Sequence, residues 1–109
     1  SLEMTDADRQ EILSVVQSHS AKHVIITHGT DSMVDTGQLL KQAEGKTIVI
    51  MGAMQPAIMK LTDADFNLGV AVAAVQTLSP GVYLCMNGRI YNVDKVIKNR
   101  AEGQFQDLG

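Results

Sequence analysis

The sequence predicts an α/β fold, a three-layer α/β/α sandwich in which helices cover both faces of a small, mainly parallel sheet. Helix-like and strand-like segments alternate along the chain, and the strand-like segments are short and rich in β-branched residues. Such alternation is typical of right-handed parallel crossovers. The chain has 109 residues, which suits one core, so we expect a single domain over residues 1–109.

The first helix and the first strand are predicted from a capping pattern followed by an apolar run. Thr5 and Asp8 have the spacing of a helix start, and apolar residues then recur at helical spacing until His19 ends the pattern. The segment 22–27 is short and rich in β-branched residues, as a buried parallel strand is. We therefore expect a helix and then a strand.

A second helix and a second strand are predicted between residues 32 and 51. From Ser32 the apolar residues return to helical spacing, and Gly45 is a plausible stop. Residues 47–51 then form an uninterrupted apolar-rich run, typical of a buried strand. The loop 52–62 is long for a simple connection, and long loops in compact domains are often functional.

The third helix has apolar residues on two faces, which predicts burial on more than one side. Asp63 is its expected cap, and Gly69 is expected to permit close packing. Residues 82–86 are the expected third strand, and Asn87-Gly88 favours a type I′ turn into a short strand at 89–91. Because so few strands leave exposed sheet edges, we expect the chain to form a homo-oligomer.

The composition argues against several classes of protein. A formal net charge of -3, with scattered Lys and Arg, argues against nucleic acid as a partner. The longest apolar stretch, 68–75, is far shorter than the roughly 20 residues of a spanning helix, so no membrane partner is expected. The single cysteine, Cys85, lies in an apolar run and is interpreted as a buried hydrophobic residue. With no visible export signal, we expect a cytoplasmic protein.

The sequence offers no motif for a cofactor or metal. No Gly-x-Gly-x-x-Gly follows any expected strand, so a dinucleotide is not expected. His23 and His28 have no second ligand at metal-binding spacing, so no metal site is expected.

Candidate chemistry begins where the first strand ends, at Thr30, Asp31 and Ser32. Ligands of open α/β sheets bind at the carboxyl ends of the strands, where the next helix offers unpaired N–H groups. An amino acid fits such a place, because its carboxylate suits the helix start and its ammonium suits Asp31. On the pattern alone, a plain helix cap after a strand is the favoured interpretation of these residues.

Three blocks of residues resemble the bacterial L-asparaginase and glutaminase family in order and separation. They are His28-Gly29-Thr30-Asp31-Ser32-Met33, then Gly52-Ala53-Met54-Gln55-Pro56, then 63–68 with Phe66-Asn67-Leu68. The segment 82–98 is also similar to the family's next strand, hairpin and lysine segment. The resemblance covers nearly the whole chain and implies the fold of the asparaginase N-terminal domain.

What the resemblance implies is an amidohydrolase that converts asparagine or glutamine to the acid and ammonia. It implies Thr30, Asp31 and Lys98 as catalytic residues. It implies Ser1, Asp31 and Ala53 as substrate-binding residues, Ala53 through its backbone carbonyl. No cofactor is implied.

Two departures from the family lower the expected activity. The family's opening strand, with a Gly-Gly-Thr signature, has no counterpart in this sequence, and neither has its carboxy-terminal domain. We therefore expect a truncated domain with low or no turnover by itself. The alternative is a non-catalytic amino-acid-binding or oligomerisation module derived from an asparaginase.

Overall fold

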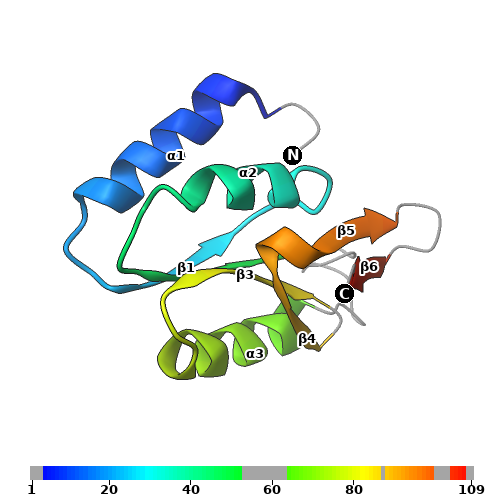
Figure 1. The fold of residues 1–109 in the computed structure, drawn as a ribbon. Helices are drawn as coiled ribbons and strands as arrows, with labels where there is room; N and C mark the ends of the chain where they lie inside the picture. The colour runs from blue at the N-terminus through cyan, green and yellow to red at the C-terminus, as the bar shows by residue number, and fades with distance from the viewer. Residues whose placement is uncertain (1–3, 53–63, 87, 100–103, 108–109) are drawn as a thin grey trace.

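The protein has helices on both faces of a sheet in the computed structural model (Figure 1). The structure describes residues 4–52, 64–86, 88–99 and 104–107, with backbone alone at 64–66, 97–99 and 104–107. In chain order the elements are α1 (Asp6–Ser18), β1 (His23–Thr27), α2 (Met33–Leu40), β2 (Thr47–Met51), α3 (Ala64–Thr77), β3 (Gly81–Met86), β4 (Arg89–Asn92), the 3-10 helix η1 (Val93–Lys95), β5 (Val96–Asn99) and β6 (Gln104–Asp107).

The main sheet has the order β1-β2-β3-β4, in which the first three strands are parallel and β4 is antiparallel. Thr27 lies beside Met51 and Met51 beside Cys85, so the three parallel strands end at one edge. Figure 1 shows α1 and α2 on one face and α3 on the other. The predicted sandwich is confirmed. The small antiparallel sheet of β5 and β6 was not predicted.

The core has two parts, one on each face of the sheet. Strand β2 lies between β1 and β3, and every one of its residues is buried. Toward α1 and α2 the buried side chains include Leu13, Met33, Leu40, Ile48, Ile50 and Leu84, and toward α3 they include Val49, Ala71, Ala74, Val75 and Cys85. Each large apolar side chain buried in this way contributes about 1.5–3 kcal/mol. The sandwich is held mainly by these two layers.

The start of α1 confirms its prediction, whereas α2 is shorter than predicted. Thr5 and Asp8 form a reciprocal capping box, with the Asp8 N–H donating to Thr5 Oγ1 over 3.2 Å and the Thr5 N–H to Asp8 Oδ2 over 3.0 Å. Helix α2 ends at Leu40, and the next residues form tighter turns, such as Ala43 N–H to Leu40 O at 3.0 Å. Gly45 then adopts φ 77°, so it serves a turn after the helix.

The prediction that α3 is buried on more than one side is wrong for its described side chains. Leu68 is 44% exposed and Val72 is 43% exposed, and a Cβ at Gly69 would meet no atom within 4 Å. Gly69 therefore serves no close packing. The spacing of apolar residues along this helix does not reveal which of its faces meets the sheet.

The predicted cap of α3 and part of the predicted turn after β3 lie outside the described residues. The expected cap is Asp63 and the first turn residue is Asn87, while Gly88 is described and has φ 67°, which suits a type I′ turn. None of the helices in the described ranges combines the length and apolar character that crossing a membrane requires.

Candidate functional site

The candidate site lies at the edge where β1 and β2 end. The His28 N–H donates to Met51 O over 2.9 Å, which continues the pairing of β1 and β2 by one residue. Beyond this bond the chain turns through residues 29–32 into α2. The ladder therefore fixes where the turn that carries Thr30 and Asp31 begins.

Gly52 lets the two strand ends approach closely. A Cβ at this position would lie 2.3 Å from the His28 carbonyl oxygen and 3.5 Å from Thr30 Cγ2. The first distance is impossible for two unbonded atoms, and the clashing oxygen belongs to the backbone. Only glycine therefore fits here, because any larger residue would push the ends of β1 and β2 apart.

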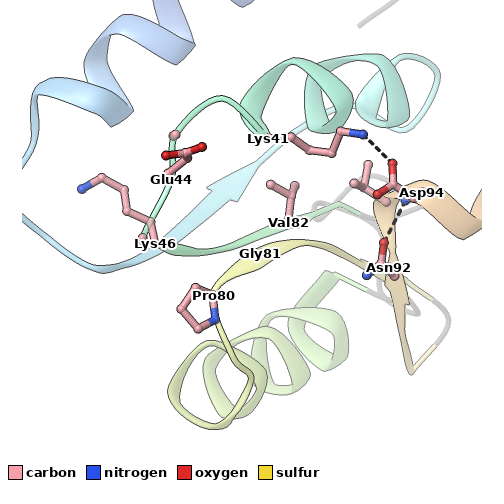
Figure 2. Close-up of a pocket in the computed structure, with 11 residues that line it drawn as sticks. Lys41, Glu44, Lys46, Pro80, Gly81, Val82, Asn92 and Asp94 are labelled. Atoms are coloured by element: carbon pink, nitrogen blue, oxygen red, sulfur yellow. Dashed lines mark hydrogen bonds and ion pairs between the residues drawn. The ribbon is translucent and has the colours of Figure 1, made fainter.

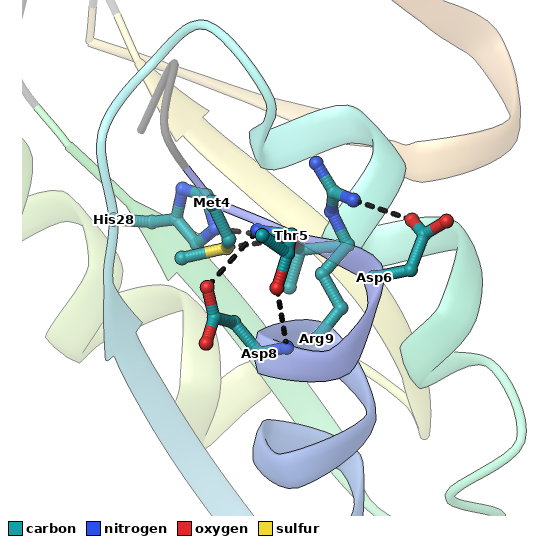
Figure 3. A network of polar contacts seen from close by, with 7 residues as sticks. Met4, Thr5, Asp6, Asp8, Arg9 and His28 are labelled. Atoms are coloured by element: carbon teal, nitrogen blue, oxygen red, sulfur yellow. Dashed lines mark hydrogen bonds and ion pairs between the residues drawn. The ribbon is translucent and has the colours of Figure 1, made fainter.

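His28 fastens this turn to α2. Its Nδ1 contacts Gly29 O at 2.5 Å and its Nε2 contacts Thr36 Oγ1 at 2.9 Å. Because a carbonyl only accepts, Nδ1 carries the proton, and in the neutral ring Nε2 then accepts from the Thr36 hydroxyl. Figure 3 shows His28 close to Met4, whose sulfur lies 3.7 Å from Thr36 Oγ1. The neutral ring thus ties the strand end to α2.

Burial is the main reason that the pKa of His28 lies below its usual 6.5. The hydrogen bond to Gly29 O acts in the opposite direction, and Arg9 lowers the pKa further. The folded protein thus binds a proton on His28 less readily than the unfolded chain does. The free energy of unfolding gains a His28 contribution that is present above pH 6.5 and is lost as the pH falls below it.

We expect His28→Gln to weaken the pH dependence of stability. Wild type should lose stability between pH 8 and pH 5, because the unfolded chain takes up a proton that the buried imidazole resists. The variant lacks this group, so the difference in free energy of unfolding between the two proteins should be largest at pH 8. Urea denaturation at both pH values measures it, and a difference that grows toward pH 5 would contradict the assignment.

Asn67 joins the ends of β2 and β3 and is fully buried. Its Nδ2 donates to Gly52 O over 3.0 Å, and its Oδ1 accepts from the Gly88 N–H at 3.3 Å. The side chain therefore holds two loop starts at the same edge. The sequence reasoning assigned Asn67 no role. An amide directly between the apolar residues Phe66 and Leu68 was the signal that could have found it, because a buried amide needs partners.

The structure brings two of the predicted catalytic residues to this edge. Thr30 and Asp31 follow β1 directly and are partly buried. Ser32 is the N-cap of α2 and is 8% exposed, and its side chain makes no capping hydrogen bond to the first turn. The N-terminus of α2 thus begins beside Thr30 and Asp31, where its first N–H groups favour an anion.

The structure describes only the backbone of Lys98 and does not describe Ser1 or Ala53. Lys98 lies in β5, where its backbone pairs with Phe105, and its side chain lies outside the described residues. In Figure 1, β5 lies at the same end of the molecule as the start of α2. Ser1 and Ala53 also lie outside the described residues. Their roles stay predictions.

Cys85 offers no nucleophile at this edge. It is fully buried, and its thiol donates to Asn67 O at 3.4 Å. Burial raises its pKa to about 11, so it is a thiol at neutral pH. Among the described residues, no three His, Cys, Asp or Glu side chains gather as a metal site.

A pocket at the opposite end of the sheet contains none of the predicted site residues (Figure 2). It has a volume of about 290 Å³ and lies where β2 and β3 begin. Lys41 Nζ and Asp94 Oδ1 form an ion pair of 2.6 Å at its margin, and Lys46 donates to the carbonyls of His19 and Ala21. The two lysines are thus held by the protein's own acceptors.

Comparison with known proteins identifies the family. Residues 1–105 match the family model described as Asparaginase, N-terminal. The chain belongs to the asparaginase family. It is 33% identical over 94 residues to the glutaminase-asparaginase of Acinetobacter glutaminasificans, covering 82% of this chain and 28% of that protein. It is 38% identical over 87 residues to the probable periplasmic L-asparaginase of Haemophilus influenzae, covering 75% and 25%.

A solved asparaginase confirms the fold. The probable cytoplasmic L-asparaginase of Campylobacter jejuni superposes with a TM-score of 0.88 at 28% identity, covering 98% of this chain and 36% of that one. The resemblance to the asparaginase N-terminal domain is therefore correct. Because the chain spans only about a quarter to a third of these relatives, their activities belong to longer proteins.

Proposed function

We propose that this asparaginase-family domain supplies part of a site that hydrolyses the side-chain amide of asparagine or glutamine. The observation that supports it most is the junction of β1, β2 and α2. There Gly52 lets the backbone of His28 come so close that a Cβ would lie 2.3 Å from its carbonyl oxygen, and Asp31 lies at the start of a helix. A hydroxyl, a carboxylate and helix N–H groups meet at one strand end, as an amino-acid substrate requires.

The proposed roles follow from the charges of the substrate. The α-carboxylate binds at the N-terminus of α2, where unpaired N–H groups favour an anion. Asp31 binds the α-ammonium group. The side-chain amide then lies toward Thr30, and the carbonyl of Ala53 accepts a hydrogen bond from its nitrogen.

The proposed reaction needs a base for Thr30. A threonine hydroxyl is a weak nucleophile at neutral pH, and a neighbouring amine activates it or a water that it positions. We assign that amine to Lys98. Attack by the Thr30 oxygen on the amide carbon forms a C–O bond, and cleavage of the C–N bond releases ammonia, which takes up the proton held by the amine. A water then attacks the resulting ester, which breaks the bond to Thr30, restores the hydroxyl and releases the carboxylic acid.

We propose low turnover for the chain alone. Groups that act as a unit lose most of the rate when one is removed, and the family resemblance includes a further threonine that this sequence lacks. An incomplete cavity also admits water, which weakens the interactions of charges within it. Binding should therefore survive better than catalysis.

Calorimetry combined with an ammonia assay tests this proposal. We expect L-aspartate to bind, and L-asparagine to be hydrolysed far more slowly than by an intact relative such as the Acinetobacter enzyme. Binding with no hydrolysis would instead indicate an amino-acid-binding module. Absence of both binding and hydrolysis would refute the assignment of a substrate site.

Assembly and location are also proposals. We propose that the domain works in a homo-oligomer in the cytoplasm. The Campylobacter protein is described as a probable cytoplasmic L-asparaginase and the Haemophilus relative as a probable periplasmic one, so the relatives support both locations. Light scattering of the purified chain measures the oligomeric state.

A further inference from the structure

The carbonyl group of Gly52, at the end of β2, is held by a buried side chain of α3. Asn67 is 0% exposed, and its Nδ2 donates to Gly52 O over 3.0 Å. The same nitrogen lies 3.9 Å from the sulfur of Met86, a weak acceptor at the end of β3. A buried amide gives up its hydrogen bonds to water, so it depends on partners such as this carbonyl.

The side-chain amide of Asn67 is itself fixed in one orientation. Its Oδ1 accepts from the Gly88 N–H at 3.3 Å, and the backbone carbonyl of Asn67 accepts from the Cys85 thiol at 3.4 Å. Because a carbonyl oxygen accepts and an N–H donates, an exchange of Oδ1 and Nδ2 would break both side-chain bonds. The end of β3 and the turn after it therefore make Asn67 present a donor to Gly52.

Gly52 needs such an anchor because it has no side chain. The His28 carbonyl oxygen excludes a Cβ at this position, since the two atoms would lie 2.3 Å apart. Glycine has the widest choice of backbone conformations, so the residue that the strand ends require is also the one that restrains the following chain least. Gly52 O belongs to the planar peptide group that joins Gly52 to Ala53. A hydrogen bond to this oxygen therefore restrains the plane in which the chain leaves β2.

We propose that Asn67 is a positioning residue that makes the site prefer the side-chain amide of the substrate to the carboxylate of the acid product. The inference rests on the proposed function, in which the Ala53 carbonyl accepts a hydrogen bond from the amide nitrogen. Asn67 acts through the Gly52–Ala53 peptide, because the plane of that peptide limits the directions open to the Ala53 carbonyl. An amide nitrogen donates to a carbonyl, whereas a carboxylate offers only lone pairs and is repelled by it.

L-Asparagine and L-aspartate test this assignment, because they share both α groups and differ only at the end of the side chain. Both dissociation constants are measured by calorimetry in the Thr30→Val background, which keeps the shape of the side chain and is expected to slow hydrolysis. With Asn67 in place, we expect L-asparagine to bind roughly tenfold or more tightly than L-aspartate, which is about the effect of one hydrogen bond.

Two substitutions of Asn67 remove the donor without adding a charge. Asn67→Leu is close in size and should reduce the preference for L-asparagine by roughly tenfold, because the Gly52 carbonyl is no longer held. This variant leaves Gly52 O and the Gly88 N–H buried without that partner, so it is the one at risk of failing to fold. Asn67→Ser leaves space in which a water can pair with both groups. It should keep the fold and show the same loss of preference.

Val75→Ala is the matched control for a general loosening of α3. Val75 is 6% exposed and lies on the same helix, roughly 12 Å beyond Asn67 at the usual rise of 1.5 Å per residue. Its loss should weaken packing against the sheet without reaching the end of β2. Both dissociation constants should then change by the same factor, so the preference for L-asparagine should stay as it was.

The ratio of the two dissociation constants decides the role of Asn67. An unchanged preference in the Asn67 variants would overturn the inference, as would equal affinities for the two ligands with Asn67 in place or an equal loss of preference in Val75→Ala. In each of these cases the ligands still bind, so the proposed function would stand. If the protein with Asn67 in place bound neither ligand, the proposed function would be refuted, and the role of Asn67 with it.

Discussion

Gly52→Ala should lower the free energy of unfolding by about 1–3 kcal/mol, the range of substitutions that overpack a buried position. The added Cβ would lie 2.3 Å from the His28 carbonyl oxygen, a backbone atom that has no rotamer to escape into. The ends of β1 and β2 must separate to relieve the contact. Urea denaturation measures the loss.

Gly69→Ala is the matched control, because this glycine has open space around its Cβ position. It lies inside α3, where alanine is favoured over glycine by about 0.5–1 kcal/mol, so this variant should be more stable than wild type. If Gly52→Ala were as stable as wild type, the close approach of the two strand ends would not be a feature of the folded protein.

Thr30→Val should reduce ammonia release from asparagine by at least roughly 100-fold, since it removes the proposed nucleophile. Valine has nearly the same shape as threonine and keeps its methyl group, so the fold should persist. Single-turnover measurements with the protein in excess detect the slow reaction of the chain alone, and binding of aspartate checks that the site is intact.

Thr30→Ser is the matched control for this experiment. It keeps the hydroxyl and loses the methyl group, so it should release ammonia within roughly tenfold of wild type. Lys98→Met should resemble Thr30→Val if the lysine amine is the base. Full activity in Thr30→Val would exclude the hydroxyl from the reaction.

The parts of the fold that depend on local patterns could be predicted from the sequence. The capping pair Thr5 and Asp8 predicted the start of α1, and the apolar run 47–51 predicted the central strand. The pairing of β5 with β6 could not be predicted, because two strands of four residues each are too short for a clear alternation of apolar and polar residues. The exposed side of α3 was not predicted because this helix carries apolar residues on its exposed side as well as on the side that meets the sheet.

The site was predictable only where it follows a strand directly. Thr30 and Asp31 come after β1, and the ends of parallel strands are where ligands bind. The contact of Gly52 with His28 and the bridge made by Asn67 depend on how separate segments meet in space. No local pattern encodes such meetings, so these residues could be assigned a role only from the structure.

The most direct measurement is a titration of the chain with L-aspartate, followed by the amide NMR signals of every assigned residue. We predict that the largest shifts fall on residues 30–33, where Asp31 and the N-terminus of α2 lie, and that Asp31→Asn weakens binding by roughly tenfold or more. Shifts centred on the pocket of Lys41 and Lys46 at the other end of the sheet, or unchanged binding by Asp31→Asn, would contradict this assignment.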